Sequence, residues 1–411
     1  MLVDLSEAAG HQQLLKGINR MALVRHLCAN PGRSRADLAV EVQLTKSTVS
    51  MLVRELIGEG WLVEREVVAT GELGRRPTPL YVDPTRLVLV GAEVGIEGVR
   101  IVITALTGEV LAQARSGYGA ARGAKSCIGV LAAAMLRACK QLDPQKQRVI
   151  GMGVGLPGGV DEASGYLHFA PNLHWRDVPV GELMAEKLAG SALAGVPLFL
   201  QNEADVAAIG EMEFNPGEAA DPLLFVSVSQ GVGAGVIVGD RLLMGRRGFA
   251  GEVGHIVLQV GGPACSCGRR GCAEALIGAR AMLADPGDED PLAEVQRRLA
   301  GGDAETARAV KKAGTYLGVL LQNLAAAYDP GCIVLGGAAV ELGDAFLQPA
   351  LDTLNDFAEA AELSPPPVRR SRFGADAVAV GAAALARYRL TRPLIAPAYA
   401  AAREAAKQEA A

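Results

Sequence analysis

Two segments that lie far apart in the chain repeat one pattern of apolar runs and glycine-bearing turns, and this repeat restricts the possible folds. Residues 87–115 read LVLVGAEVGIEGVRIVITALTGEVLAQAR, and residues 223–246 read LLFVSVSQGVGAGVIVGDRLLMGR. Each segment predicts a strand, a turn, a strand, a tight turn and a strand. Alanine-rich helical stretches follow at about 123–142 and 303–328. Two similar α/β units predict a two-lobed molecule with a ligand cleft between the lobes, although glycine-rich hairpins are common enough to coincide by chance.

Composition and charge exclude several classes of protein. The chain has 411 residues, half of them apolar and 21% charged, which suits two or three folded domains with a buried core. No apolar run reaches the roughly 18 residues that a membrane span needs. The first residues, MLVDLSEAAGHQQ, lack the basic start and apolar core of a secretory signal, so a cytoplasmic protein is expected. The net charge of −5 argues against a chain that coats nucleic acid along its whole length.

The N-terminal segment 13–82 predicts three helices followed by a polar hairpin. The first helix is expected over about 13–28. Ser34, with Asp37 three residues later, indicates a capping box at the start of the second helix, and Thr45 indicates the start of the third. In the third helix, apolar residues recur with the period of one helical face: Val49, Leu52, Val53, Leu56 and Ile57.

This order of elements is typical of a winged helix-turn-helix, whose third helix enters the major groove of DNA. Strand-like runs at 61–68 and 78–82 would form the wing, with GELGRRP at its tip. Segment 13–54 carries seven Lys and Arg residues against two Asp and Glu residues, so its positive charge is local. A small helical protein-binding module with a solvated polar face is the alternative. The candidate DNA-binding residues are Arg35, Thr45, Lys46, Ser47, Thr48, Ser50, Arg54, Arg75 and Arg76.

A cluster of cysteines follows the second repeat. His255, Cys265, Cys267 and Cys272 offer one imidazole and three thiols within a short stretch, which is a ligand set of structural zinc sites. Because the protein would fill all four positions of a tetrahedral Zn²⁺, no position remains for water, and the predicted metal is structural. Reduced, buried thiols without metal are the alternative. The remaining cysteines lie singly in apolar or helical contexts and are expected in the core: Cys28, Cys127, Cys139 and Cys332.

Six short motifs follow one another in the larger part of the chain. They are VGLPGGVD at 154–161, PNLHW at 171–175, NEAD at 202–205, GEVGH at 251–255, CSCGRRGCAE at 265–274 and IVLGG at 333–337. In this order they resemble the motifs of the ROK family of sugar kinases and sugar-responsive repressors, over about residues 10–390. The resemblance implies an α/β fold, the duplicated actin-like or hexokinase-like (ribonuclease H-like) two-lobed ROK domain. In the repressor branch of that family a winged helix-turn-helix precedes this domain.

The resemblance also implies a division into domains. Residues 1–85 would form the DNA-binding domain, and residues 86–206 the first ROK lobe, which is completed by about 372–392. Residues 207–371 would form the second lobe with the zinc site. The tail from 393 to 411 carries no function that we infer.

The same resemblance suggests which residues bind a sugar. Sugar hydroxyls both donate and accept hydrogen bonds, so carboxylates, amides and imidazoles suit them. In similar ROK proteins, the matching positions contact sugar hydroxyls: Asn202, Glu203, Glu252, His255 and Glu274. One ring nitrogen of His255 would then bind zinc and the other would face the sugar, while Glu274 follows the last thiol closely, so zinc would fix both. Asn172 is a further candidate, although an Asn in a turn is more often structural, and a lone Glu is more often a surface charge.

The kinase branch of the family approaches ATP with Asp-x-Gly-Gly-Thr in the first hairpin. Here the hairpin carries Glu93, and Ile96 and Glu97 place a side chain and a negative charge where phosphates would lie. The expected catalytic base is Glu203, one methylene longer than the usual Asp, and Asp205 replaces the last Asn of that motif. We therefore expect a protein that is not an enzyme and assign no catalytic residue.

The sequence thus predicts a sugar-responsive transcriptional regulator, a repressor in particular. It would bind an inverted-repeat operator as a homodimer or higher oligomer, hold structural Zn²⁺ and take a monosaccharide or sugar derivative as its effector. A ROK-type, ATP-dependent sugar kinase that carries a DNA-binding head is the alternative. A regulator controlled by a protein partner, without sugar, is a third possibility. The identity of the sugar, the operator sequence and the direction of the response do not follow from the sequence.

Overall fold

The computed structural model describes residues 5–66, 78–119, 123–218, 220–246, 248–285 and 290–392. These residues form two compact units. Unit 1 comprises the residues up to Gln201 together with those from Ala382 onward, and unit 2 comprises Asn202–Gly381. Among the described helices, none combines the length and the apolar composition that crossing a membrane requires.

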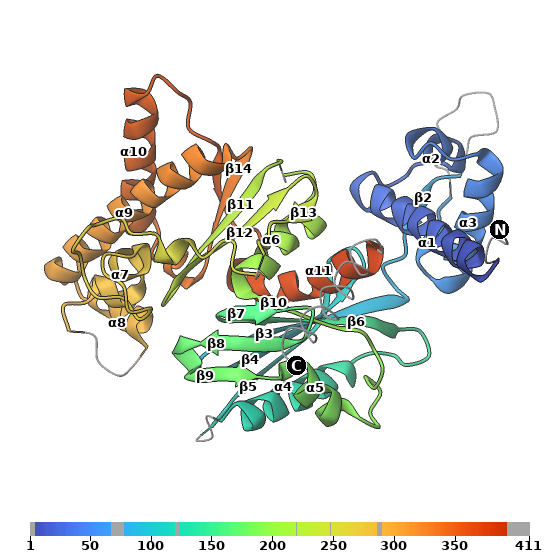
Figure 1. The fold of residues 1–411 in the computed structure, drawn as a ribbon, viewed down its shortest axis with the longest axis horizontal. Helices are drawn as coiled ribbons and strands as arrows, with labels where there is room; N and C mark the ends of the chain where they lie inside the picture. The colour runs from blue at the N-terminus through green and yellow to red at the C-terminus, as the bar shows by residue number, and fades with distance from the viewer. Residues whose placement is uncertain are drawn as a thin grey trace. The chain divides into compact units, whose positions relative to one another are not determined.

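The chain begins with three helices and a two-stranded antiparallel sheet, drawn in blue in Figure 1. The elements are α1 (Leu5–Ala29), α2 (Arg35–Glu41), α3 (Lys46–Glu59), β1 (Leu62–Glu64) and β2 (Leu80–Val82). The predicted capping box is confirmed, because the Asp37 N–H donates to the Ser34 hydroxyl and the Ser34 N–H donates to the Asp37 carboxylate. The predicted start of the first helix at about Gln13 is wrong, since α1 begins at Leu5 and continues through Gly10.

Helix α3 follows its predicted pattern closely. The hydroxyl of Thr45 accepts a hydrogen bond from the N–H of Thr48 and caps the helix. The predicted stripe supplies the buried face through Val49, Leu52, Val53 and Leu56, while Ile57 is half-buried. Gly60 ends the helix in the left-handed conformation, with φ of +86°, which glycine adopts without strain.

The main sheet of unit 1 has the strand order β10-β6-β3-β4-β5. Its strands are β3 (Leu87–Val94), β4 (Gly98–Ala105), β5 (Val110–Gly117), β6 (Arg148–Leu156) and β10 (Leu198–Asn202). Strand β4 runs antiparallel to β3 and β5, whereas β6 runs parallel to β3. Helices α4 (Ala124–Cys139) and α5 (Val180–Leu188) pack on one face and share a hydrophobic core with the sheet (Figure 1).

The other face of β6 accepts helix α11 (Ala377–Thr391). Two glycines of β6 permit this contact, because a Cβ on Gly153 would lie 1.8 Å from the carbonyl oxygen of Ala382, and one on Gly151 would lie 2.9 Å from Leu390. Near its end, α11 also contacts α1, since the Arg25 guanidinium donates to the carbonyl of Thr391 at 3.1 Å.

A small three-stranded antiparallel sheet, β7-β8-β9, completes unit 1. Its strands are β7 (Gly159–Asp161), β8 (Tyr166–Ala170) and β9 (Trp175–Val178), and the short helix η1 (Pro171–Leu173) joins the last two. None of these three strands was predicted from the sequence.

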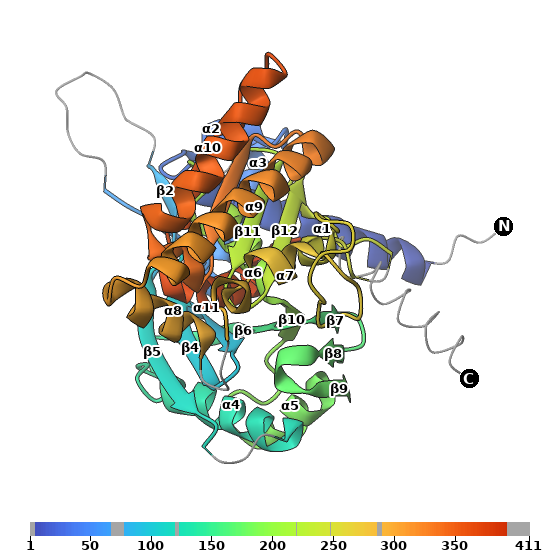
Figure 2. The same ribbon diagram turned by 90° about the vertical axis from the view of Figure 1, so that its left-hand side faces the viewer.

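The sheet of unit 2 has the order β13-β12-β11-β14-β15. Its strands are β11 (Leu223–Val228), β12 (Val232–Val238), β13 (Arg241–Leu242), β14 (Cys332–Gly336) and β15 (Val368–Arg370). Helices α9 (Ala304–Tyr328) and α10 (Asp344–Ala360), which run alongside each other in Figures 1 and 2, share one core with this sheet. Helix α6 (Glu203–Phe214) packs on β11 and β12 from the opposite side (Figure 1). The remaining short elements are η2 (Val253–His255), α7 (Ala273–Ile277), η3 (Ala279–Met282), α8 (Pro291–Ala300), η4 (Ala338–Leu342) and η5 (Gly374–Asp376).

The predicted repeat is confirmed in both units. Each sheet contains two successive antiparallel pairs from one meander, and in each sheet a later strand joins the first strand in parallel. The helices predicted after each repeat are present as α4 and α9. The copies differ in their third strands, because β13 spans 2 residues where β5 spans 8.

Candidate functional site

Strand β12 is the scaffold on which the candidate site of unit 2 is built. A Cβ on Gly235 would lie 2.6 Å from the carbonyl oxygen of Ala204, and one on Gly233 would lie 3.3 Å from the Ala204 Cβ. These glycines therefore let the first turn of α6 approach the strand. The approach places Asn202 and Glu203, the cap and the first residue of α6, beside β12.

The segment from Gly251 to His255 lies against the same strand. The N–H of Ala234 donates to the carbonyl of Gly251 at 3.1 Å. A Cβ on Gly254 would lie 2.1 Å from the carbonyl oxygen of Val232, so only glycine permits this approach. As a result, Glu252 and His255 are held beside β12.

The carboxylate of Glu274 lies at the turn between β11 and β12. Its Oε2 atom accepts from the N–H of Val232 at 3.4 Å, and its Oε1 atom accepts from the hydroxyl of Ser266 at 3.1 Å. A Cβ on Gly231 would lie 2.6 Å from Oε2, so this glycine leaves room for the carboxylate. Ser266 was missed by the sequence analysis, although its position between two candidate metal ligands was an available signal.

Four side chains form a candidate metal centre. The ligand atoms of His255, Cys265, Cys267 and Cys272 all lie within 4.8 Å of one another. The Cys267 and Cys272 sulfurs are 3.7 Å apart, and His255 Nδ1 lies 3.7 Å from the Cys265 sulfur. A tetrahedral Zn²⁺ with Zn–S bonds of about 2.3 Å separates its sulfur ligands by about 3.8 Å, so the donor set and its spacing fit a metal of this kind. The other four cysteines are buried or half-buried: Cys28, Cys127, Cys139 and Cys332.

The two ring nitrogens of His255 face different partners. Nδ1 faces the cysteine cluster, whereas Nε2 lies 4.0 Å from Oε2 of Glu252. Burial raises the pKa of the Glu252 carboxyl above its ordinary value, and Glu274 raises it further, while His255 opposes the shift. The imidazole thus lies between the cysteine cluster and Glu252, while Glu274 approaches the cluster directly, with its Oε1 atom 3.8 Å from the Cys265 sulfur.

The predicted sugar-binding residues fall into two groups. Asn202, Glu203, Glu252, His255 and Glu274 belong to unit 2 and come from elements that pack around β12. The amide oxygen of Asn202 also accepts from the N–H of Ala204 at 2.8 Å and caps α6. Asn172 belongs to unit 1, where it is an exposed residue of η1, and is not part of this group.

The predicted DNA-binding residues of the helical module differ in their surroundings. Lys46, Ser47 and Arg54 are exposed on α3, and Ser50 is half-buried. The hydroxyl groups of Thr45 and Thr48 lie 2.8 Å apart at the start of the helix, so they take part in its cap. Arg75 and Arg76 lie outside the described residues.

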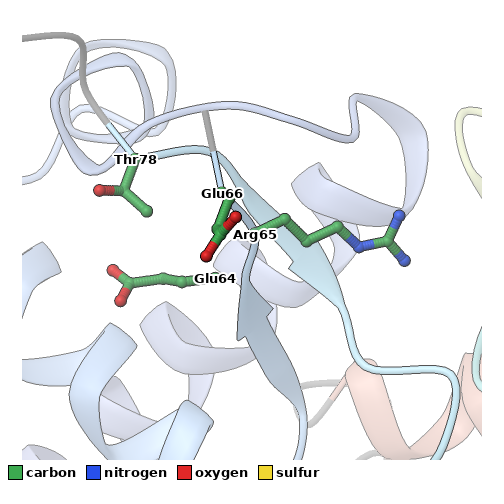
Figure 3. Close-up of a pocket in the computed structure, with 4 residues that line it drawn as sticks. All are labelled: Glu64, Arg65, Glu66 and Thr78. Atoms are coloured by element: carbon green, nitrogen blue, oxygen red, sulfur yellow. The ribbon is translucent and has the colours of Figure 1, made fainter. Parts of the chain in front are cut away.

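Arg35 lies at the base of the β1–β2 hairpin, where the structure also has a small pocket. The guanidinium of Arg35 makes an ion pair with Glu64 at 2.9 Å. Glu64, Arg65, Glu66 and Thr78 line a pocket there, and Arg65 points away from Glu64 and Thr78 in Figure 3. Because the guanidinium of Arg65 lies over the ring of Tyr81 at 4.4 Å, the pocket itself is lined mainly by carboxylates and does not suit an anion.

These features first define a class of protein: a duplicated, hexokinase-like α/β chain with a candidate metal centre and an N-terminal helical module. The chain belongs to the ROK family, whose family model matches residues 89–389.

Three relatives illustrate the range of this family. The chain is 32% identical to the xylose repressor of Bacillus subtilis (strain 168), over 80% of this chain and 84% of the relative. The crystal structure of a ROK family transcriptional regulator, a homologue of the E. coli MLC protein, matches 94% of this chain and 99% of its own with a TM-score of 0.74 at 22% identity. A ROK family glucokinase from Streptomyces griseus, solved with glucose and AMPPNP, matches 73% of this chain and 99% of its own with a TM-score of 0.62 at 26% identity.

Proposed function

We propose that this protein is a sugar-responsive transcriptional repressor. Its N-terminal domain, residues 1–85, is a winged helix-turn-helix that binds operator DNA, and its ROK lobes, residues 86–206 with 372–392 and residues 207–371, bind a monosaccharide or sugar derivative. The observation that carries this proposal is the gathering of Glu252, His255 and Glu274 around β12, in a chain that also exposes Lys46 and Arg54 on α3 of its N-terminal module. The similarity to the xylose repressor supports the same function.

The effector can be identified by a thermal-shift screen of monosaccharides and their phosphates. The names of two of these relatives suggest xylose and glucose as the first members of the panel. A ligand at a hundred times its dissociation constant stabilises the protein by about 2.7 kcal/mol and raises its melting temperature. If no sugar in the panel stabilises the protein, a regulator controlled by a protein partner becomes the better candidate.

We further propose that the candidate metal centre holds structural Zn²⁺. The bound ion would join the loop that carries Cys265 and Cys267 to His255 and to the start of α7. Because the protein supplies all four ligands, the metal would orient the surrounding residues and leave no coordination position for a substrate.

A sugar kinase that carries a DNA-binding head is the second candidate, and the match to the glucokinase favours it. The first hairpin argues against it. The carboxylate of Glu93 makes an ion pair with Arg100 at 3.3 Å, and the exposed Glu97 adds negative charge at the turn, where a nucleotide phosphate would be repelled.

We therefore expect no phosphorylation above background when the protein is incubated with ATP, Mg²⁺ and each stabilising sugar. The measurement is product formation by mass spectrometry, with a known glucokinase as the positive control. Turnover near about 10 s⁻¹, which is typical of an enzyme, would make the kinase the leading candidate.

The DNA-binding surface is tested by removing its charges. Lys46→Ala should weaken binding to operator and to random DNA alike, because a lysine that contacts phosphate carries no sequence information. It should also reduce the slope of log K against log[salt] by about one. Lys140→Ala, an exposed lysine outside the module, is the matched control and should leave both quantities unchanged.

The wing is tested in the same assay. The double variant Arg75→Ala/Arg76→Ala should bind operator more weakly than the wild type. It should also show a shallower slope of log K against log[salt], because each arginine that contacts phosphate releases about one counterion. An operator affinity and a salt slope equal to those of the wild type would remove the wing from the proposed interface.

A further inference from the structure

The outward face of α3 carries an apolar residue at its centre. The buried residues of this helix, Val49, Leu52, Val53 and Leu56, form one stripe. With 100° per residue, the positions directly opposite that stripe are Ser47, Met51, Arg54 and Gly58. Met51 is 46% exposed, although methionine is more often found in protein interiors.

Within the described residues of the module, helix α1 covers only a flank of α3 and leaves Met51 exposed. Helix α1 is tied to a flank of α3 by the ion pair between Lys16 and Glu55 at 2.8 Å and by a second pair between Arg20 and Glu59. Glu59 lies further along the helix, whereas Glu55 is the i+4 neighbour of Met51, so the flank that contacts α1 borders the Met51 face. Met51 nevertheless keeps 46% of its surface exposed.

The charge around Met51 indicates what covers it. From Lys46 to Arg54 the helix contains these two cations and no acidic residue. Both cations are exposed. At 100° per residue, Arg54 lies about 60° from Met51 around the helix, whereas Lys46 lies about 140° away at the N-terminal end. The acidic neighbour of Met51 on this helix, Glu55, is about 40° away and is paired with Lys16. A partner for this face must combine a dense negative charge with a small apolar group, and duplex DNA meets both requirements.

The major groove presents one apolar group, the C5-methyl of thymine. Methionine is unbranched and adaptable, so it can cover a methyl group at the floor of the groove while the flanking cations contact phosphates. We propose that Met51 reads thymine in each operator half-site through contact with this methyl group. The proposal rests on the proposed function, because it requires that α3 enters the major groove.

The experiment begins with the full-length protein and a random DNA pool, from which the bound operator is selected and sequenced. Each thymine of the operator is then replaced singly by deoxyuridine, which lacks only the methyl group. Burial of one methyl group changes binding by about fourfold, so deoxyuridine at the contacted position should weaken wild-type binding about fourfold. Deoxyuridine at other positions should have little effect.

Three variants complete the design. Met51→Ala should bind the thymine operator more weakly and show no further loss with deoxyuridine, because the contact is already absent. Met51→Leu keeps an apolar side chain and should retain the dependence on the methyl group. Val40→Ala shortens another exposed apolar side chain of the module, 75% exposed on α2, and should show the wild-type pattern of thymine dependence.

The outcomes separate the inference from the proposed function. If the protein selects no DNA sequence at all, the proposed function fails. If it selects an operator but no deoxyuridine substitution weakens binding, or if Met51→Ala retains the same penalty as the wild type, the role of Met51 is wrong and the regulator function stands. Melting temperatures of the variants close to that of the wild type establish that each one folds.

Discussion

Replacing Cys267 by serine is expected to remove bound metal and sugar affinity together. Among the four candidate ligands Cys267 is exposed, so the substitution changes coordination without opening a cavity in the core. A serine hydroxyl is a poor replacement for a thiolate, and three ligands bind Zn²⁺ far more weakly than four. Metal analysis should fall from about one zinc per chain to a small fraction of that.

The loss of sugar affinity follows from the geometry of the loop. His255 Nδ1 faces the cluster, and Glu274 is held by Ser266, which lies between two of the cysteines. Without metal, both the imidazole and the carboxylate lose the support that orients them. Losing such support typically costs about 10- to 100-fold in affinity or activity, so a reduction of this size is expected in a calorimetric titration with the sugar found by the screen.

The matched control is Cys139→Ser, which makes the same chemical change in a half-buried cysteine outside the cluster. It should retain both zinc and sugar. A Cys267→Ser protein that contains no metal but binds sugar with full affinity would contradict the link between the two sites.

The second large effect concerns the two carboxylates of the candidate sugar site. Glu252→Gln and Glu274→Gln keep the size of each side chain but replace an acceptor oxygen by a donor. Each variant should bind operator as the wild type does and fail to respond to sugar. Glu359→Gln, an exposed residue of α10, should leave the response intact.

The size of the lost response follows from the free energy that the change between DNA-bound and free protein requires. A complete change from mostly bound to mostly free DNA requires the sugar to prefer one state by about 5.5 kcal/mol, so a variant that loses the sugar loses the whole effect. By linkage, saturating operator must change the sugar affinity of the wild type by the same factor as sugar changes operator affinity. Equal sugar dissociation constants with and without operator would mean that the site binds sugar but does not control DNA binding.

The regulator is further expected to be a symmetric dimer on DNA. One helix-turn-helix reads a short half-site, which is too little information for a genome, whereas two copies related by a twofold axis read an inverted repeat. Sugar would then act by changing the separation of the two recognition helices relative to the fixed half-sites.

Several parts of this molecule could be predicted because their signals are local. The caps at Ser34 and Thr45 depend on hydrogen bonds within three residues of each cap. The metal cluster consists of one histidine and three cysteines close together in the sequence, a combination with few other uses, so its ligand set could be predicted without any distance. The repeated hairpins were visible because their glycine turns punctuate runs of apolar residues.

Other parts could not be predicted because they depend on residues far apart in the chain. The fully buried carboxylate of Glu211 in α6 pairs with Arg369 of β15 at 2.8 Å, and nothing near either residue indicates its partner. The strands β7, β8 and β9 span 3, 5 and 4 residues, too short for a clear alternation of apolar and polar side chains. The grouping of Glu252 and Glu274 was expected only from the family resemblance, because its physical basis is a set of close backbone approaches to β12.

The duplicated hairpins have a consequence for how such a family can diverge. In unit 2, the turn after β11 contacts the carboxylate of Glu274, because Gly231 leaves room for it and the N–H of Val232 donates to it. In unit 1, the matching turn carries Ile96 and Glu97 and belongs to a different compact unit. The two copies of this structural unit therefore carry different side chains at the matching turn. Substitutions can accumulate in the first turn while the second keeps its contacts with Glu274, so one copy of the hairpin can change its chemistry without disturbing the other.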